Sequence, residues 1–183
     1  MAEYSNSKKI FEQLMNGQVI NRHVLDNSGY TPNPLFDEIV HSEDEYKKQY
    51  RMSGYQLVIN ENYILLQNAA SDADSLKTDV SMKAYVLLLL IGRYLNTRNY
   101  RISKIEPSGS GLSIADISLM EEMPDIREIL DKADMKKNLL AHIKLVLVER
   151  SLMLEKVGSD AYALSDAGSA FFQEIFSHFY DSE

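Results

Sequence analysis

The sequence contains no cysteine, no long hydrophobic run and no apolar signal core. Without cysteine, the chain can form neither disulfides nor thiolate metal sites, and it has no thiol nucleophile. Its longest apolar run, residues 84–91, is interrupted only by Tyr85 and is far shorter than the roughly 20 residues that span a bilayer. The opening residues, MAEYSNSKKIFEQ, lack an apolar core. We therefore expect a cytoplasmic protein that is neither exported nor inserted into a membrane.

Patterns that carry catalysis or bind metals are also missing. The histidines at 23, 41, 142 and 178 are scattered, with neither HExxH nor another paired spacing. The segment Gly109-Ser110-Gly111 lacks the lysine of a P-loop and fits neither GxGxxG nor GxSxG. We interpret it as part of a flexible loop. The acid pairs lie in polar segments, where the burial that acid–base catalysis needs is not expected. We therefore expect no metal, no cofactor and no enzymatic activity.

Positive charge is scarce overall but concentrated locally. The formal net charge of −8 argues against a surface devoted to DNA, because non-specific affinity for nucleic acid comes mainly from lysine and arginine. Between Asp79 and Glu106, however, there is no acidic residue. Two interpretations stay open for this interval: a solvated helix end, whose cations interact with the helix dipole, or a contact with nucleic acid or an acidic partner. Its basic residues are Lys83, Arg93, Arg98, Arg101 and Lys104.

Residues 135–164 are typical of the second half of a winged helix. Apolar residues from Leu139 to Leu147 recur at helical spacing, while Lys137 and Lys144 share another face of the same helix. Alternating residues then lead to the turn Gly158-Ser159-Asp160, which predicts a hairpin. The tip of this hairpin is acidic, so it is poorly suited to gripping phosphate.

The order of helices followed by a hairpin occurs twice. In the first part we predict a loop at 23–33 and a capping box of Ser42 with Glu45. The predicted helices are 7–15, 34–40 and 42–52, and the predicted strands are 55–59 and 63–67. In the second part the predicted helices are 80–96, 112–120, 124–132 and 135–151, with a last helix from Ser165 or Asp166.

These patterns predict a mainly α fold with small β-hairpins, of the α+β class, built from tandem winged-helix domains. We place an N-terminal winged-helix-like domain at 1–70, a linker at 71–79 and a C-terminal winged-helix domain at 80–183. The terminal helix of the second domain is rich in phenylalanine. Its apolar stripe is either core or a surface for a partner or a second copy. The stripe consists of Phe171, Phe172, Ile175, Phe176 and Phe179.

The first third of the chain resembles a known family. The similarity lies in FEQLMNGQVI at 11–20, EYKKQY at 45–50 and SGYQLV at 53–58, which leads into the first hairpin. These segments are similar to the MukE and MksE proteins, the tandem winged-helix KITE subunits of bacterial condensin-like SMC complexes. The similarity in element order covers nearly the whole chain.

The resemblance implies a non-catalytic homodimer that binds a kleisin of the MukF or MksF type. Through the kleisin it would meet an SMC ATPase, which carries out the ATP chemistry. It also implies a nucleoid-associated role in chromosome organisation and segregation, or in plasmid defence, with DNA as a secondary, non-specific contact. The charge pattern supplies the DNA-contact candidates, Arg93, Arg98, Arg101, Lys104, Lys136, Lys137 and Lys144.

A free-standing winged-helix transcription regulator is the alternative. Such a protein would read base edges with arginine, asparagine or glutamine on its recognition helix. Asn138 is the only such residue early in the predicted helix. An enzyme that uses carboxylates in a cleft is a third and weaker alternative.

Overall fold

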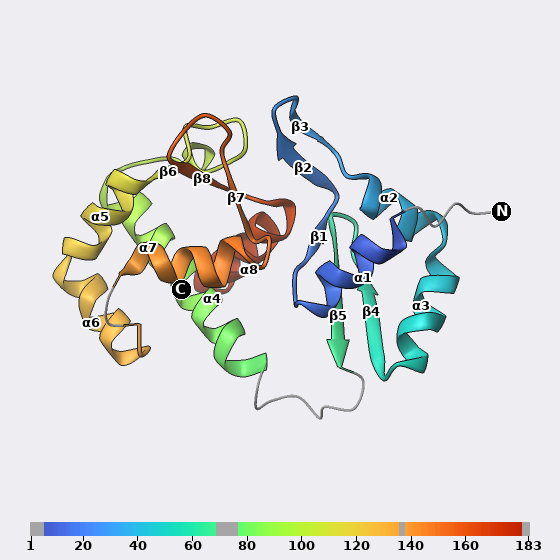
Figure 1. Cartoon of the computed structure of the whole chain (residues 1–183). Coiled ribbons are helices and arrows are strands. Elements are labelled where there is room, and N and C mark those ends of the chain that lie inside the picture. The colour runs from blue at the N-terminus through green and yellow to red at the C-terminus, as the bar shows by residue number, and fades with distance from the viewer. Residues whose placement is uncertain (1–5, 69–76, 136–137, 181–183) are drawn as a thin grey trace. The chain divides into compact units, whose positions relative to one another are not determined.

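The computed structural model describes residues 6–68, 77–135 and 138–180. The chain divides into two compact units, Met1–Asp74 and Ser75–Glu183 (Figure 1). Each unit combines helices with a small antiparallel sheet, so the predicted α+β class is confirmed. The predicted linker, 71–79, lies largely outside the described residues, although 77–79 already belong to a helix. The assignment of 1–70 and 80–183 as winged-helix domains stays a prediction.

The first unit holds a three-stranded sheet together with helices. The last strand of its sheet, β5, lies between β1 and β4, and Ile64 of β5 is paired with both Ile20 and Ile59. Its elements are α1 (Ser7–Met15), β1 (Ile20–Asn21), β2 (His23–Asp26), β3 (Gly29–Pro32), α2 (Pro34–His41), α3 (Glu43–Met52), β4 (Tyr55–Ile59) and β5 (Tyr63–Asn68).

The core of this unit forms where one face of each helix meets the sheet. Residues three or four apart on a helix share a face, and α1 buries Ile10 with Leu14 while α3 buries Tyr46 with Tyr50. Phe11, the neighbour of Ile10 on α1, is by contrast 46% exposed. Leu57 and Ile64 complete the core from the strands.

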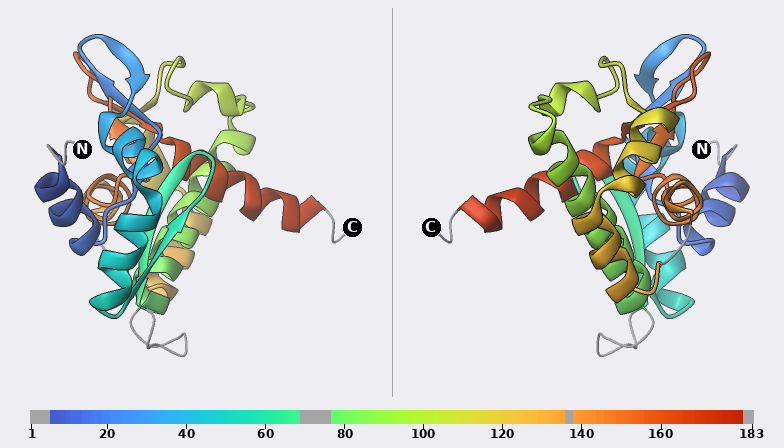
Figure 2. Two further views of the ribbon diagram at one scale, coloured as in Figure 1. Left: turned by 90° about the vertical axis from the view of Figure 1, so that its right-hand side faces the viewer. Right: turned by 90° about the vertical axis from the view of Figure 1, so that its left-hand side faces the viewer.

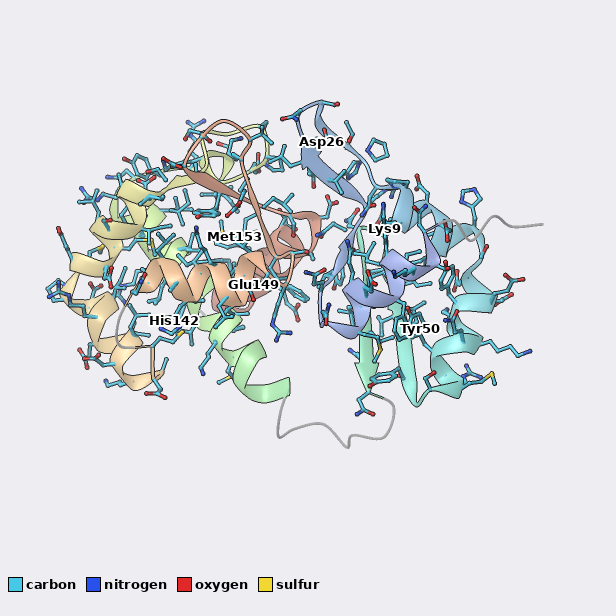
Figure 3. All side chains as sticks on the ribbon, in the orientation of Figure 1. Lys9, Asp26, Tyr50, His142, Glu149 and Met153 are labelled. Carbon is cyan, nitrogen blue, oxygen red and sulfur yellow. The ribbon has the colours of Figure 1, made fainter. Side chains whose placement is uncertain are left out.

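The segment 23–33 is not the loop predicted from its polar composition, because β2 and β3 form a hairpin. Asp26 is paired with Gly29 around a two-residue turn, and the Ser28 backbone N–H donates to Asp26 Oδ1 at 2.7 Å. Gly29 has a φ of 104°, which suits glycine. Asp26 lies at the tip of the hairpin in Figure 3. The strands are only partly buried, so the sequence shows no clean alternation of apolar and polar residues.

The predicted capping box at the start of α3 is also absent. The Ser42 side chain makes no capping hydrogen bond there, and the Tyr46 backbone N–H donates instead to the Ser42 carbonyl at 3.1 Å. The side chain that does cap a helix nearby is Asn33, whose Oδ1 accepts from the Leu35 backbone N–H at 3.0 Å. Asn33 Nδ2 also donates to the Asn21 carbonyl at 2.8 Å, which ties α2 to β1.

The second unit repeats the topology of the first. In its sheet the last strand, β8, again lies between the first strand and the middle strand, β6 and β7. Its elements are α4 (Lys77–Thr97), the 3₁₀ turn η1 (Ile102–Lys104), β6 (Leu112–Ser113), α5 (Ile114–Glu122), α6 (Pro124–Lys132), α7 (Leu139–His142), the π-helical η2 (Ile143–Val148), β7 (Met153–Glu155), β8 (Ala161–Leu164) and α8 (Asp166–Tyr180).

The helix predicted at 135–151 begins later and changes character within its length. Residues 136–137 lie outside the described part of the chain, and Asn138 adopts φ 60°, a left-handed conformation that asparagine tolerates. Its Oδ1 accepts from the Ala141 backbone N–H at 3.0 Å and so caps α7. After His142 the helix widens into the π-helical η2. The predicted apolar face is confirmed, since Leu139, Ile143 and Leu147 are buried.

The helix predicted at 112–120 is preceded by a short strand. Leu112 and Ser113 pair with β8, and α5 starts only at Ile114. Ser113 then provides a complete capping box with Asp116: the Ser113 side chain accepts from the Asp116 backbone, and the Asp116 carboxylate accepts from the Ser113 backbone. The glycine segment before it is a packed turn, because the Gly111 N–H donates to the Lys104 carbonyl at 2.7 Å and Gly109 is surrounded by backbone.

The long helix α4 is the centre of the second unit. It is apolar over most of its circumference, a pattern expected of a helix buried on several sides. Its sides pack against η2 and α8. Leu87, Leu90, Ile91 and Tyr94 of α4 are fully buried. Across the residues described, no helix is both long and apolar enough to cross a bilayer.

Candidate functional site

Lys104, a predicted DNA contact, is used inside the fold. Its Nζ lies 3.0 Å from Asp116 Oδ2, and its side chain is only 19% exposed. The same ammonium lies 4.8 Å from the centroid of the Tyr100 ring, within cation–π range. Lys104 therefore joins the segment after α4 to the start of α5.

Asp116 is the centre of a buried polar cluster. Besides Lys104 and the Ser113 cap, its carboxylate accepts a hydrogen bond from the Tyr94 hydroxyl at 2.8 Å. Burial alone would raise the pKa of Asp116, but hydrogen bonds from Ser113, Tyr94 and Lys104 outweigh burial and hold that pKa below its usual range. Burial and the bond to Asp116 raise the pKa of Tyr94. The cluster holds a neutral tyrosine beside an ionised carboxylate and ties α4, η1 and α5 together.

Arg93 forms an ion pair between α4 and α6. Its Nε lies 2.6 Å from Asp125 Oδ2, and both side chains are partly exposed. Burial, although slight, acts to raise the pKa of Asp125, while hydrogen bonds from the α6 backbone and from Arg93 lower it by more. An exposed pair of this kind contributes little to stability but offsets local charge. Arg93 is thus a weaker DNA-contact candidate than a cation with no acid beside it.

The remaining described basic candidates lie on two different elements. Arg98 and Arg101 are exposed in the segment between α4 and η1, and the Arg98 guanidinium lies 5.7 Å from the centroid of the Tyr94 ring. Lys144 is exposed on η2. Lys136 and Lys137 lie outside the described residues. The structure therefore places two exposed arginines in the segment after α4 and Lys144 on a separate element.

The outer face of the α7–η2 segment is not that of a typical DNA reader. Leu145 stands 58% exposed at its middle, beside exposed Lys144. Glu149, an acid, follows at the end of the segment, and Figure 3 shows His142 and Glu149 along its length. Within α7 and η2, Lys144 is therefore the one lysine or arginine, and an exposed leucine and an acid follow it.

The phenylalanine stripe of α8 packs largely within its own unit. Phe172 and Ile175 are buried, and α8 packs on α4. The Phe176 ring lies 4.5 Å from the Phe172 ring, centroid to centroid. Phe171 is half-buried, and the side chain of Phe179 lies outside the described residues. Figure 2 shows the C-terminal end of α8 leading away from α4. The stripe is thus mainly core, with its far end as the remaining partner candidate.

Sequence reasoning missed a groove in the second unit, which we call the α4–α8 groove. Its volume is about 460 Å³, and α4, α6 and α8 form its walls. The residues come from four separate segments, so no local pattern announces them. The sequence shows only that two large apolar residues, Tyr100 and Ile102, lie shortly after α4. The lining residues are Leu89, Gly92, Arg93, Leu95, Asn96, Tyr100, Ile102, Ile129, Phe172 and Phe176.

A second groove lies between α1 and α3 of the first unit. It measures about 490 Å³, and the exposed Phe11 ring forms part of its wall. Lys8 and Glu45 stand on its two sides, so its charge is mixed. No group of three or more histidines or acids within the described part of the chain is arranged to hold a metal ion.

Comparison with known proteins identifies the family. No curated protein matches the chain. The family model described as condensin complex protein MksE matches residues 5–176, a range that includes the whole described part of the first unit and nearly all of the second. A match of this extent covers both repeats of the topology, and the chain therefore belongs to the MksE family of condensin complex proteins.

Proposed function

We propose that this protein is a non-catalytic subunit of a bacterial condensin-like SMC complex. It acts as a homodimer that binds a kleisin of the MukF or MksF type and, through it, an SMC ATPase. The observation that carries the proposal is the family match over residues 5–176, which extends across both units. The complex would act in chromosome organisation and segregation, or in plasmid defence.

The repeated topology supports a tandem winged-helix architecture. A winged helix has the order helix, strand, helices and hairpin, with the last strand between the other two. Both units have this order, because β5 lies between β1 and β4 and β8 lies between β6 and β7. The β2–β3 hairpin is an addition to the first unit, and α8 is an addition to the second.

A binding role agrees with the chemistry of the described residues better than catalysis does. The most strongly hydrogen-bonded carboxylate, Asp116, is enclosed by structural partners and capped by Ser113. The surface offers apolar grooves and exposed apolar side chains, which are features of protein contacts. The excess of acid fits protein partners as the main contacts and DNA as a secondary one.

Affinity purification of the native protein tests the proposal. We expect a kleisin and a large coiled-coil ATPase to be recovered with it in stable amounts. Recovery of the protein by itself, from cells in which the other subunits are present, would contradict the assignment and favour the free-standing regulator.

The DNA contact is tested separately in the assembled complex. We propose that Arg98, Arg101 and Lys144 contribute to DNA capture, since these are the exposed described candidates apart from Arg93, which is paired with Asp125. Reversing all three to glutamate should weaken DNA capture and flatten its salt dependence, because fewer phosphate counterions are released. Lys8→Glu, at an exposed cation of the first unit, is the control. Equal binding by the triple variant and the control would refute the DNA face.

The alternative regulator predicts selective duplex binding by the isolated protein. The exposed Leu145 and the acidic hairpin tip weigh against it, since neither contacts phosphate favourably. Mobility-shift assays at moderate salt separate the two functions: the regulator requires a preferred sequence, whereas the complex subunit does not.

A further inference from the structure

Strand β4 is an unpaired edge of the sheet in the first unit. Within the described residues, β5 lies along one side of β4, and the strand order β1-β5-β4 leaves no strand along the other side. Beside the turn, the Asn60 N–H donates to the Tyr63 carbonyl at 2.9 Å. Hydrogen-bonded pairs recur at every second residue of an antiparallel ladder, so Val58 and Gln56 also bond to β5.

The residues that alternate with these pairs direct their backbone groups to the open side of β4. They are Tyr55, Leu57 and Ile59, and on that side their N–H and C=O groups form no hydrogen bond with any described residue. Helix α3 packs instead on the core face of the strand, where Tyr46 and Tyr50 join Leu57 in the core. The structure that completes such an edge is another β-strand, because a strand offers N–H and C=O groups at the matching spacing.

Other sheet edges in the described part of the chain carry features that discourage pairing. Strand β3 ends in Pro32, which has no N–H to donate. Strand β1 has only two residues, and Asn33 Nδ2 already donates to the Asn21 carbonyl. Strand β7 has three residues, one of which is the exposed acid Glu155. By contrast β4 has five residues, Tyr55–Ile59, with neither a charge nor a proline.

An exposed apolar side chain lies next to this edge in the chain. Met52 ends α3 three residues before β4, and its exposure of 81% is the highest among the large apolar side chains described. The start of β4 therefore combines open backbone groups with apolar surface that a partner would remove from water.

The strand is suited to pairing with its own copy. Antiparallel pairing about a two-fold axis at Leu57 places Tyr55 opposite Ile59 of the second copy. All three residues face the open side, so each of their N–H and C=O groups gains a partner. The strand has no charged side chain, so like charges do not meet across the axis. On the outer face, Gln56 comes opposite Val58 of the second copy.

We propose that β4 pairs antiparallel with β4 of a second copy of this chain, with the two-fold axis at Leu57, and so joins two sheets into one continuous sheet. The inference names the interface of the homodimer and therefore rests on the proposed function. The occupant follows from the open backbone groups, which a strand satisfies, and from an uncharged sequence whose register is self-complementary.

Other occupants fit this edge less well. DNA phosphates accept hydrogen bonds but donate none, so they would leave the C=O groups of the edge without donors. A helix has paired its own backbone groups internally and has few to offer. A strand of a different protein would pair in the same way, and crosslinking distinguishes it from a second copy.

The absence of cysteine makes disulfide crosslinking a direct test in the full-length protein. Gln56→Cys and Val58→Cys each introduce one thiol on the outer face of β4. Opposite residues of an antiparallel pair have Cβ atoms about 4.5–5.5 Å apart, whereas diagonal neighbours are about 7–8 Å apart. The proposed register places position 56 opposite position 58 of the second copy, and it places equal positions diagonally.

Co-expression of the two variants should therefore give a disulfide-linked dimer on mild oxidation. Either variant alone should give at least about fivefold less of it, since its thiols lie too far apart. Non-reducing electrophoresis measures the linked fraction. Val157→Cys, at an exposed apolar residue of the second unit, is the control, and its co-expression with Gln56→Cys should give only the background level.

Charges placed at the same two positions test the register without a crosslink. Gln56→Lys with Val58→Lys brings like charges together twice in the dimer, whereas Gln56→Lys with Val58→Glu brings opposite charges together twice. Both double variants lose the same two side chains. Sedimentation at a series of dilutions measures dimer dissociation, and we expect a dissociation constant at least about tenfold higher for the two-lysine variant. Thermal melting checks that both are folded.

Four results would overturn the interface: a monomeric protein, a dimer without the 56–58 link, equal dissociation of the two charge variants, or a link from position 56 to a different protein of the native complex. These results are distinguishable from a failure of the proposed function. If a kleisin and an ATPase are recovered but the 56–58 link does not form, only the interface is lost. If the link forms but neither protein is recovered, the complex is wrong and the interface stands.

Discussion

Two tyrosines one turn apart on α3 have opposite hydrogen-bonding environments in the first core. The Tyr46 hydroxyl donates to Glu38 Oε1 at 2.6 Å. The Tyr50 hydroxyl is buried, and no described residue provides it with a hydrogen-bond partner. Burial raises the pKa of Tyr50 to about 12. A buried hydroxyl without a partner loses its hydrogen bonds to water and forms none in the protein. The Tyr50 hydroxyl therefore offsets part of the stabilisation that burial of the ring provides. Figure 3 shows Tyr50 on the side of α3 that faces the sheet.

Removing each hydroxyl should therefore change stability in opposite directions. Tyr50→Phe is expected to raise the free energy of unfolding by about 1 kcal/mol, because it deletes an unpaired buried polar atom. Tyr46→Phe is expected to lower it by about 1–2 kcal/mol, because Glu38 loses a charge-assisted donor. Urea denaturation of the two variants and the parent measures both. Destabilisation by Tyr50→Phe would mean that its hydroxyl has a partner, such as a bound water.

Asp116 should make stability dependent on acid. Its folded-state pKa is lowered, so its contribution is present at neutral pH, begins to decrease near the ordinary carboxyl pKa of about 4, and is lost as the pH falls through the folded-state pKa. Asp116→Asn is expected to destabilise the protein by roughly 2–4 kcal/mol at pH 7, since it also leaves Lys104 without its partner. Its stability should depend less on pH below about 5 than that of the parent.

Denaturation curves between neutral and acidic pH check this prediction. Asp160→Asn, at the exposed hairpin tip, provides the control because it also removes one carboxylate but leaves the cluster intact. An acid dependence that is the same in Asp116→Asn and the parent would show that another group controls it.

At the level of single residues, the sequence predicted which side chains are buried better than which side chains form pairs. Helical spacing predicted the buried face of Leu139, Ile143 and Leu147, because burial follows from periodicity. The Lys104–Asp116 pair could not be predicted, since it depends on a packed turn that brings the two side chains together. Lys104 therefore entered the DNA-contact candidates as one more cation of an acid-free interval.

At the level of elements, the packing of α8 against α4 includes one close contact, between Phe176 and Gly92. A Cβ added at Gly92 would lie 1.9 Å from Cζ of Phe176, closer than any real contact. The obstacle is the far end of a side chain that has other rotamers available. Gly168 presents the opposite case, because its obstacle at 1.9 Å is the Leu152 carbonyl oxygen, which belongs to the backbone.

The sign of the Gly92→Ala effect should depend on Phe176. In the parent, crowding of the new methyl group against the Phe176 ring should cost about 1–3 kcal/mol of stability. Replacing glycine by alanine in a helix gains about 1 kcal/mol, so we expect net destabilisation. In a Phe176→Ala background the obstacle is gone, and Gly92→Ala should stabilise by about 0.5–1 kcal/mol. A double-mutant cycle by urea denaturation measures both values. Gly168→Ala should destabilise in either background. The same sign for Gly92→Ala in both backgrounds would exclude the ring as the cause.

Elements with strong local signals were predicted closely, and those without them were not. The helices 7–15 and 124–132 were predicted with their observed ends, because Gly17 ends the first and Pro124 starts the second. The β2–β3 hairpin was missed because its partly buried strands show no clean alternation of apolar and polar residues. The π-helical η2 has no sequence signature at all, since it has the apolar spacing of an ordinary helix.

For the whole molecule, repetition of element order was visible in the sequence, whereas the α4–α8 groove was not. Each repeat could be recognised from local helix and hairpin signals. The groove combines residues as distant as Leu89, Ile129 and Phe176, and only the packed unit brings them together. Recognition of the family depended on residue similarity in the first third of the chain, and the family match then extended over both units.

Each unit has its own core, which predicts independent responses to mutation. The core cluster around Tyr50 consists entirely of residues of the first unit, while Gly92 and Phe176 belong to the second. Mutations without shared partners add within about 0.5 kcal/mol, whereas neighbours couple by up to about 3 kcal/mol. The double variant Tyr50→Phe with Gly92→Ala should therefore equal the sum of its single variants, while Gly92→Ala with Phe176→Ala should not. Calorimetry of the full-length chain measures both sums. Coupling above about 1 kcal/mol in the first pair would contradict the independence of the two cores.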